Sequence, residues 1–244
     1  MLTELNCVVV DLETTGLDPK RDKIIEIGAL KIRNGQITDS FCALVNPGRK
    51  LEQRIVEITG ITDTELEDAL YIEEILPSFL EFAGKDDLMG HSVLFDYSFL
   101  KRAAVNRNCS FERNGIDTLR IARRHLAELE SRSLPFLCRH FEIPHNPHRA
   151  LSDVEATYEL YKRLVGDFYR EELAADEKKI FMPAKLIYQV KREQPATAGQ
   201  IERLEKLLRM HNIVPDRNIY KMTRNEASRY ADMIRSGRIG MHDL

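Results

Sequence analysis

The sequence predicts an α/β protein in which a mixed β-sheet is flanked by helices, with a small helical appendage at the C-terminal end. Residues 6–12 and 24–32 are short runs rich in β-branched side chains, and the dipeptide Asn34-Gly35 separates the second run from residues 37–45. Two such runs around Asn-Gly predict a β-hairpin. Three early strands followed by alternating helices and strands favour a mixed sheet with helices packed on its faces.

Apolar residues at helical spacing predict the elements that follow the hairpin. The expected helices span residues 72–82, 95–106, 118–129, 134–141 and a long segment that starts near Leu151, and a short strand is expected at 87–92. Strands and helices therefore alternate through this half of the chain, as they do in proteins whose sheet contains parallel strands.

A polar stretch with two prolines, residues 181–196, predicts a linker between a main domain of residues 1–180 and a helical segment of residues 197–244. Two helices are expected in this last segment. Each begins with the sequence signature of a capping box, and the second ends at a glycine. The residues concerned are Thr197 with Gln200, Thr223 with Glu226, and Gly237.

Composition excludes several classes of protein. The 244 residues include no apolar run that approaches the ~20 residues needed to span a bilayer, and the N-terminus lacks the pattern of a secretory signal, so we expect a cytoplasmic protein without membrane contact. The sequence shows no P-loop or dinucleotide fingerprint. The cysteines lack C-x-x-C spacing and are expected to be reduced thiols: Cys7, Cys42, Cys109 and Cys138.

The net charge of −3 is unevenly distributed. Residues 191–244 contain 11 Lys and Arg against 7 Asp and Glu, whereas residues 1–190 contain 25 against 32. The positive balance of the tail is compatible with binding of nucleic acid or a partner, although a charged helix face in contact with solvent would have the same composition.

Asp11 and Glu13 lie at the end of the first expected strand, where a period of two places both side chains on one face. Two adjacent carboxylates can hold a divalent cation. The small residues Thr14, Thr15 and Gly16 follow directly and would let a substrate approach the backbone. The alternative is that both acids are ordinary residues of a strand end and turn.

Asp96 lies near the start of an expected helix, just after the strand that contains His91. It is a candidate metal ligand, but aspartate is common at this position because it caps helices and interacts favourably with their N-terminal dipole. His91 alone is equally ambiguous, since a histidine at a strand end is often a hydrogen-bonded structural residue.

His148 and Asp153 are five residues apart, at the junction of a loop and the long helix. An aspartate in the helix could bind metal, while a histidine in the preceding loop could move toward an attacking water. Histidine is suited to remove that proton because its ordinary pKa lies near neutrality. The region also contains His140 and His145, so some of these histidines are expected to be surface residues.

Three segments occur together in a characteristic order: VVVDLETTGLDPKRDKIIEIGAL, GHSVLFDYSFL and HRALSDVEATYELYKRL. On these segments, residues 4–168 resemble the DnaQ-like exonucleases, the histidine-bearing DEDD class that includes the proofreading epsilon subunit of DNA polymerase III. The resemblance implies an RNase H-like fold and a metal-dependent 3′→5′ exonuclease that releases 5′-mononucleotides.

The resemblance also implies a role for each site residue. The metal-site acids would be Asp11, Glu13, Asp96 and Asp153, and His148 would be the general base. The acids would hold two divalent ions, Mg²⁺ or Mn²⁺, which carboxylate ligands favour over zinc. In this scheme Asp11 bridges both ions.

Contacts to the substrate are expected from Thr14, Leu17, His91 and Phe99. Leu17 could wedge against the terminal base and His91 could contact the terminal nucleotide. Phe99 could pad the pocket, or it could belong to the helix core. At Ser92 the chain departs from the pattern, because many relatives have asparagine after this histidine.

The motifs predict the type of reaction, but the same motifs would serve an enzyme that acts on DNA or one that acts on RNA. We expect the 3′ end of DNA as the substrate, in proofreading or repair, with a DNA polymerase or helicase as a possible partner. A 3′→5′ exoribonuclease is the alternative enzyme. A catalytically idle nucleic-acid-binding or polymerase-scaffolding subunit is the alternative from another class, but such a protein should have lost one of the five catalytic residues.

Overall fold

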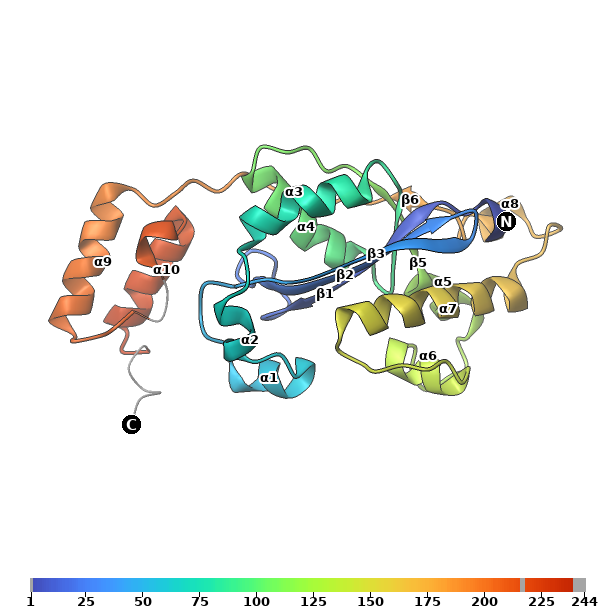
Figure 1. The fold of residues 1–244 in the computed structure, drawn as a ribbon, viewed down its shortest axis with the longest axis horizontal. Helices are drawn as coiled ribbons and strands as arrows, with labels where there is room; N and C mark the ends of the chain where they lie inside the picture. Colours follow the sequence, from blue (N-terminus) through green and yellow to red (C-terminus); the bar gives the residue numbers. More distant parts are fainter. Residues whose placement is uncertain (1, 216–217, 239–244) are drawn as a thin grey trace. The chain divides into compact units, whose positions relative to one another are not determined.

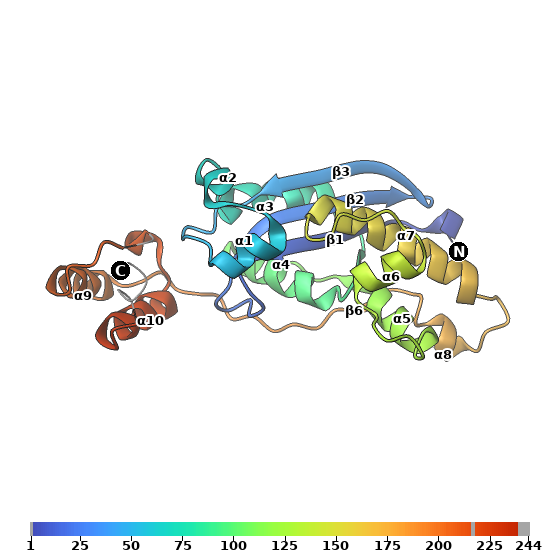
Figure 2. The same cartoon turned by 90° about the horizontal axis from the view of Figure 1, so that it is seen from below.

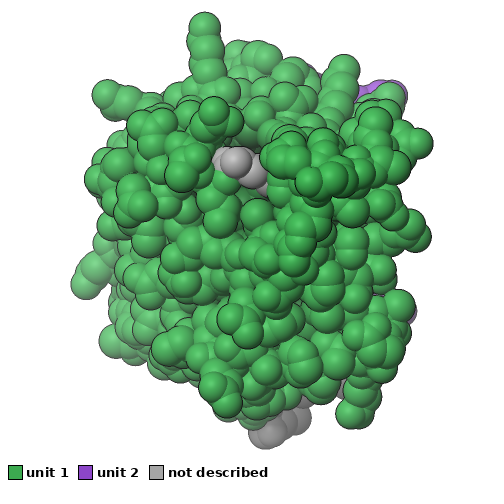
Figure 3. Space-filling model, turned by 90° about the vertical axis from the view of Figure 1, so that its right-hand side faces the viewer, with its two compact units in different colours: residues 1–47, 51–190 green, residues 48–50, 191–244 purple. Residues whose placement is uncertain are grey.

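The computed structural model describes residues 2–215 and 218–238, and part of the expected C-terminal segment, residues 216–217 and 239–244, lies outside this range. The chain forms two compact units, one of residues 1–47 with 51–190 and one of residues 48–50 with 191–244. Figure 3 shows one side of the first unit. Each unit has its own core.

The first unit contains a single mixed sheet of six strands in the order β3-β2-β1-β4-β5-β6 (Figure 1). Strand β1 pairs with β2 antiparallel and with β4 parallel, so it lies inside the sheet. The pairs β2–β3 and β5–β6 are antiparallel and the pair β4–β5 is parallel. The strands are β1 Cys7–Thr14, β2 Ile24–Arg33, β3 Gln36–Leu44, β4 Leu88–Gly90, β5 Asn114–Asp117 and β6 Ala184–Lys185.

The hairpin expected around Asn-Gly joins β2 and β3. Asn34 has φ 49° and Gly35 has φ 71°, and the flanking residues Arg33 and Gln36 are directly paired. Positive φ at both central residues is the requirement of a tight two-residue hairpin turn, which asparagine and glycine meet at low cost. The hairpin prediction is therefore confirmed.

Helices cover both faces of this sheet. Figures 1 and 2 show α3 and α4 on one face and α5, α6 and α7 on the other. The helices of the unit are α1 Gln53–Thr59, α2 Asp63–Glu67, α3 Ile72–Ala83, α4 Leu94–Asn106, α5 Thr118–His125, α6 Leu134–His140, α7 Ala150–Phe168 and α8 Ala175–Lys178, and a short 3₁₀ turn, η1, spans Leu2–Glu4. No helix among residues 2–215 and 218–238 is both long and apolar enough to cross a membrane.

Strand β1 contributes to the cores on both faces of the sheet. Val8, Val10 and Leu12 are buried in the cluster that includes residues of α3 and α4. Cys7 and Val9 are buried in the other cluster, which includes residues of α5, α6 and α7. Alternation along the strand therefore assigns its odd-numbered side chains to the face that α7 covers.

The segment expected to be a linker, residues 181–196, is not a linker throughout. Phe181 and Leu186 are buried, and Ala184–Lys185 form β6 at the edge of the sheet. The prolines and polar residues suggested a linker because a two-residue strand is too short to produce a periodic pattern. Residues up to 190 belong to the first unit.

The second unit consists mainly of two helices, α9 Ala198–Met210 and α10 Arg224–Arg235, with a 3₁₀ turn, η2 Ile219–Lys221, between them. Both helices begin with the expected capping box. Their buried residues form a separate core: Leu204, Leu208, Ile219, Met222, Ala227, Tyr230, Ala231 and Ile234.

Candidate active site

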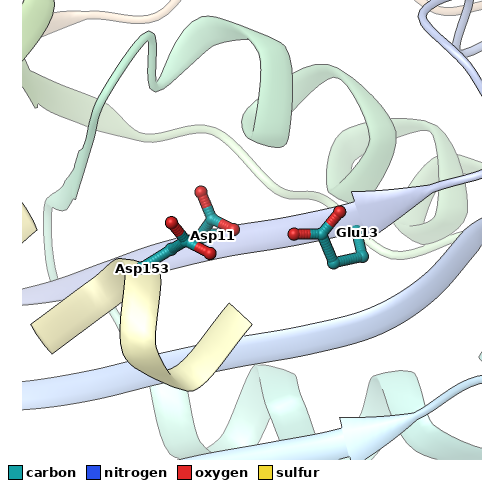
Figure 4. A group of neighbouring side chains, drawn as sticks. All are labelled: Asp11, Glu13 and Asp153. Carbon is teal, nitrogen blue, oxygen red and sulfur yellow. The ribbon is translucent and has the colours of Figure 1, made fainter. Parts of the chain in front are cut away.

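Three carboxylates from two elements meet beside β1. Asp11 and Glu13 continue the odd-numbered face of the strand, and Asp153 lies in the first turn of α7, which covers that face. Each residue offers an oxygen atom, and these atoms all lie within 4.8 Å of one another. Figure 4 shows Asp11 and Asp153 side by side, with the Glu13 carboxylate turned toward them.

Asp96 reaches the same strand from the opposite layer. It lies in the first turn of α4, is 3% exposed, and its Oδ1 accepts the backbone N–H of Leu12 at 3.1 Å. Leu12 stands between Asp11 and Glu13 in the sequence. This bond spans 84 positions of the chain, so Asp96 is more than a local helix cap and connects α4 to the strand that carries the other acids.

The carboxylates raise one another's affinity for protons. Burial and then the neighbouring Asp96 and Asp153 raise the pKa of Asp11 well above its ordinary value, and burial raises the pKa of Asp96 as well. Burial, followed by Asp153 and Glu26, raises the pKa of Glu13 from 4.5 to about 8. Ionised carboxylates crowded in this way repel one another until a cation compensates their charge. An all-oxygen donor set suits a hard divalent cation such as Mg²⁺ or Mn²⁺.

These shifts predict how pH affects the metal-free protein. The folded state binds a proton at Glu13 more tightly than the unfolded state, so the associated stability is complete below pH 4.5 and is lost as pH rises to about 8. In EDTA the unfolding temperature should fall between pH 5 and pH 8. Adding Mn²⁺ should raise it more at pH 8 than at pH 5, because the cation binds the deprotonated acids.

Differential scanning calorimetry with and without Mn²⁺ at both pH values measures this effect. Asp11→Asn is the control, because it removes one of the repelling charges and should flatten the pH dependence in EDTA. A metal-free unfolding temperature that rises over this range would contradict the electrostatic description of the site.

A histidine other than the expected base contacts one of the acids. Nε2 of His145 lies 2.6 Å from Oδ1 of Asp153, and the His145 side chain is 5% exposed. The other oxygen, Oδ2, accepts the backbone N–H of Arg149 at 3.0 Å. His148 is exposed and its backbone adopts a left-handed conformation, with φ 66°. In this structure both oxygens of Asp153 therefore have protein partners, and His148 lies in the loop that precedes α7.

Sequence reasoning gave no sign of the contact between His145 and Asp153. The loop before α7 turns back on itself, with left-handed residues at Glu142 (φ 56°) and His148 (φ 66°). The N–H of Asn146 also donates to the hydroxyl of Ser152 at 2.9 Å. Such a contact depends on the path of an irregular loop, which hydrophobic periodicity does not describe.

The expected substrate contacts differ in their exposure. Leu17 is 78% exposed, just beyond the strand that carries the acids, whereas Thr14 is buried and its hydroxyl donates to the carbonyl of Gly16 at 2.7 Å. Phe99 is 4% exposed, and its ring centre lies 5.1 Å from that of Phe95. Phe99 thus packs in the hydrophobic cluster that includes residues of α3 and α4.

His91 has partners within the protein at both ring nitrogens. Nε2 lies 2.8 Å from the carbonyl oxygen of Arg132 and therefore carries the proton, which leaves Nδ1 to accept the hydroxyl of Thr118 at 2.9 Å. Burial lowers the pKa of His91, which favours this neutral form. The next residue, Ser92, has φ 78° and donates its N–H to Asp117 at 3.0 Å. A left-handed backbone at this position suits asparagine better than serine.

Comparison with known proteins relates this site to a family of nucleases. Residues 8–161 match the family model RNase_T, described as an exonuclease. The DNA polymerase III PolC-type of Thermotoga petrophila is 44% identical over 161 residues, which are 65% of this chain and 12% of that protein. The DNA polymerase III subunit epsilon of Aquifex aeolicus is 35% identical over 173 residues, which are 66% of this chain and 86% of that protein.

Solved structures share the fold. The nuclease domain of 3′hExo, described as a DEDDh family member bound to rAMP, superimposes with a TM-score of 0.59 at 18% identity, over 75% of this chain and 97% of that one. The mixed sheet flanked by helices is therefore the RNase H-like arrangement of these exonucleases. The chain spans only 11% to 17% of the length of the PolC-type relatives it matches.

Proposed function

We propose that this chain, which belongs to the RNase_T exonuclease family, hydrolyses the terminal phosphodiester bond at the 3′ end of DNA and releases 5′-mononucleotides. The observation that carries the proposal is the meeting of Asp11, Glu13 and Asp153 within 4.8 Å, with Asp96 bonded to the same strand. Carboxylates in such an arrangement hold divalent cations, on which this family of exonucleases depends.

The acids would hold two divalent cations, Mg²⁺ or Mn²⁺, through Asp11, Glu13 and Asp153, with Asp96 in support. When bound, such cations offset the charge of the phosphate, activate a water and stabilise the leaving oxygen. His148, in the exposed loop, would take the proton from the attacking water. His145 holds Asp153 in place before a cation is bound. Leu17, which is exposed and follows Glu13 by four residues, would contact the terminal base.

DNA is favoured over RNA because the named relatives in Thermotoga petrophila and Aquifex aeolicus are components of DNA polymerase III. The same names favour a role in proofreading or repair beside a DNA polymerase. An exoribonuclease is the second candidate, because a structure with the same fold was solved with rAMP bound. A catalytically idle subunit is disfavoured, since all four acids and His148 are present.

Oligonucleotide hydrolysis tests the proposal directly. DNA and RNA oligomers of one sequence, labelled at the 5′ end, are incubated with the protein in Mg²⁺, in Mn²⁺ or in EDTA, and the products are resolved by length and by chromatography. We expect stepwise shortening from the 3′ end of DNA, release of 5′-mononucleotides and no reaction in EDTA. Cleavage of a circular single strand or undiminished activity in EDTA would refute the proposal, and faster hydrolysis of RNA would favour the second candidate.

Removal of the C-terminal segment, residues 197–244, should leave the chemistry intact. Every proposed catalytic residue belongs to the first unit, and the second unit has its own core. At saturating concentrations of a short oligomer, we expect kcat within about twofold of the full chain, while KM for longer DNA rises because the segment is positively charged. Steady-state kinetics, with circular dichroism to verify folding, measure both. A folded truncated protein without turnover would mean that the segment contributes to the active site.

A further inference from the structure

Another buried acid, Glu26, lies beside the site without belonging to the proposed set of metal ligands. It is 1% exposed and stands directly opposite Glu13 in the β1–β2 pairing. Two like charges in opposite positions on neighbouring strands repel each other. A buried carboxylate is tolerated there only when other groups compensate its charge and satisfy its oxygens. The partners of Glu26 therefore indicate what the residue does.

Those partners lie mainly at the junction between the His148 loop and α7. Oε2 of Glu26 accepts the backbone N–H of Ala150 at 3.0 Å, and Oε1 accepts Nη2 of Arg149 at 3.2 Å. The thiol of Cys42 adds a weak contact to Oε1 at 3.8 Å. Glu26 thus bonds both to the first residue of α7 and to the residue that separates it from His148.

Gly28, two residues further along β2, brings the backbone of α7 close to the strand. A Cβ at this position would lie 2.3 Å from the carbonyl carbon of Ala150 and 2.7 Å from the backbone nitrogen of Leu151. Real Cβ atoms do not approach backbone atoms so closely, so only glycine permits this packing. Strand β2 therefore holds the start of α7 at two adjacent points, by packing at Gly28 and by hydrogen bonds at Glu26.

This attachment lies between two residues of the proposed active site. His148 is two residues before Ala150 and Asp153 is three residues after it, and the N–H of Arg149 donates to Asp153 at 3.0 Å. We propose that Glu26 is a positioning residue, which fixes Arg149 and Ala150 on β2 so that the His148 loop pivots about a defined point beside the acids. This inference rests on the proposed function, because Glu26 can act as a positioning residue only if His148 is the general base.

Graded substitutions separate the two bonds that Glu26 makes. Glu26→Ala removes both bonds, whereas Glu26→Gln retains an amide oxygen for Ala150 and loses the ion pair with Arg149. Displacement of a catalytic group by about 1 Å can lower the rate about 10²-fold. We expect Glu26→Ala to lower kcat about 100-fold with little change in KM, and Glu26→Gln to lower it about tenfold. In the Glu26→Ala variant, the additional substitution Arg149→Met should lower kcat only slightly further.

Arg33→Met is the matched control. Arg33 is the last residue of β2 and donates to Asp86 at 2.6 Å, so the substitution breaks an ion pair of the same strand away from the junction. It should lower the unfolding temperature and leave kcat unchanged. Mn²⁺ titration should give wild-type affinity for Glu26→Gln, because Glu26 is outside the ligand set.

Hydrogen exchange gives a measurement that is independent of activity. The Ala150 amide should exchange faster in Glu26→Ala than in wild type or in Arg33→Met, since its acceptor is lost. If the Ala150 amide exchanges at the wild-type rate in Glu26→Ala, the inference is overturned. Faster exchange together with a wild-type kcat would also overturn it, because the contact would then be merely structural. A large loss of Mn²⁺ affinity in Glu26→Gln would also overturn it. If the wild-type protein releases no mononucleotides, the proposed function fails, whereas the exchange experiment still decides whether Glu26 holds the junction.

Discussion

Replacement of Asp11 by alanine should reduce hydrolysis to the limit of detection at every pH. An oxygen of Asp11 lies within 4.8 Å of oxygens of both Glu13 and Asp153, and burial, Asp96, Asp153 and Glu13 raise the pKa of Asp11. If Asp11 is a metal ligand as proposed, its loss cannot be compensated by a neighbour, so higher pH or higher substrate concentration should not restore the rate. Calorimetric titration should show that Mn²⁺ affinity falls in parallel with the rate.

The same substitution should stabilise the metal-free protein. In EDTA near pH 8 the remaining acids would repel one another less, so the unfolding temperature of Asp11→Ala should exceed that of wild type. Asp18→Ala is the control, because Asp18 lies just beyond β1 and its Oδ1 accepts the N–H of Lys20. This control should retain both turnover and Mn²⁺ affinity. An Asp11→Ala protein that keeps measurable turnover with Mn²⁺ would refute the central role of Asp11.

Replacement of His148 by alanine should affect the rate without affecting metal binding. Loss of a general base typically costs about 10²–10⁴-fold in rate. Because the base acts mainly in the transition state, the loss should appear in kcat rather than in KM. Hydroxide can substitute for the base, so the rate of the variant should recover in part at higher pH. Mn²⁺ titration should give wild-type affinity.

His145→Gln is the matched comparison for His148→Ala. His145 is buried against Asp153 at 2.6 Å, whereas His148 is exposed in the loop before α7. We expect His145→Gln to retain most of kcat, because glutamine can still donate a hydrogen bond to Asp153. A near wild-type kcat for His148→Ala, together with a large loss for His145→Gln, would transfer the role of the base to His145.

The sequence predicted the hairpin, β4 and the helices from α3 to α7, and it missed several other short elements. The hairpin and α3, α4 and α7 carry clear signals, because they contain complete periods of apolar residues or a specific turn dipeptide. Helices α1 and α2 span only Gln53–Thr59 and Asp63–Glu67, and β5 spans only Asn114–Asp117. Elements of this length contain too few residues to establish a period, and their conformation depends on contacts with the rest of the unit.

Local patterns could not bring the candidate site together. Alternation predicts that Asp11 and Glu13 share a face, but Asp96 approaches β1 from a different layer and Asp153 comes from the last long helix of the unit. Only the joint occurrence of three motifs linked these residues. The same limit applies to His91, whose partners are Thr118 and the backbone of Arg132. These partners are distant in the sequence, so the choice between substrate contact and internal hydrogen bonding was open.

The position of β1 in both cores has a kinetic consequence. Val8, Val10 and Leu12 belong to one cluster and Cys7 and Val9 to the other, so burial of these apolar side chains fixes the register of the strand. A shift by one residue would transfer each of these side chains to the opposite core and turn the acids that follow away from the face that α7 covers. A cation therefore encounters a site that apolar packing has already assembled. It should slow the unfolding of the native protein and leave the refolding rate almost unchanged, which is the result expected of a site that is completed after the transition state of folding.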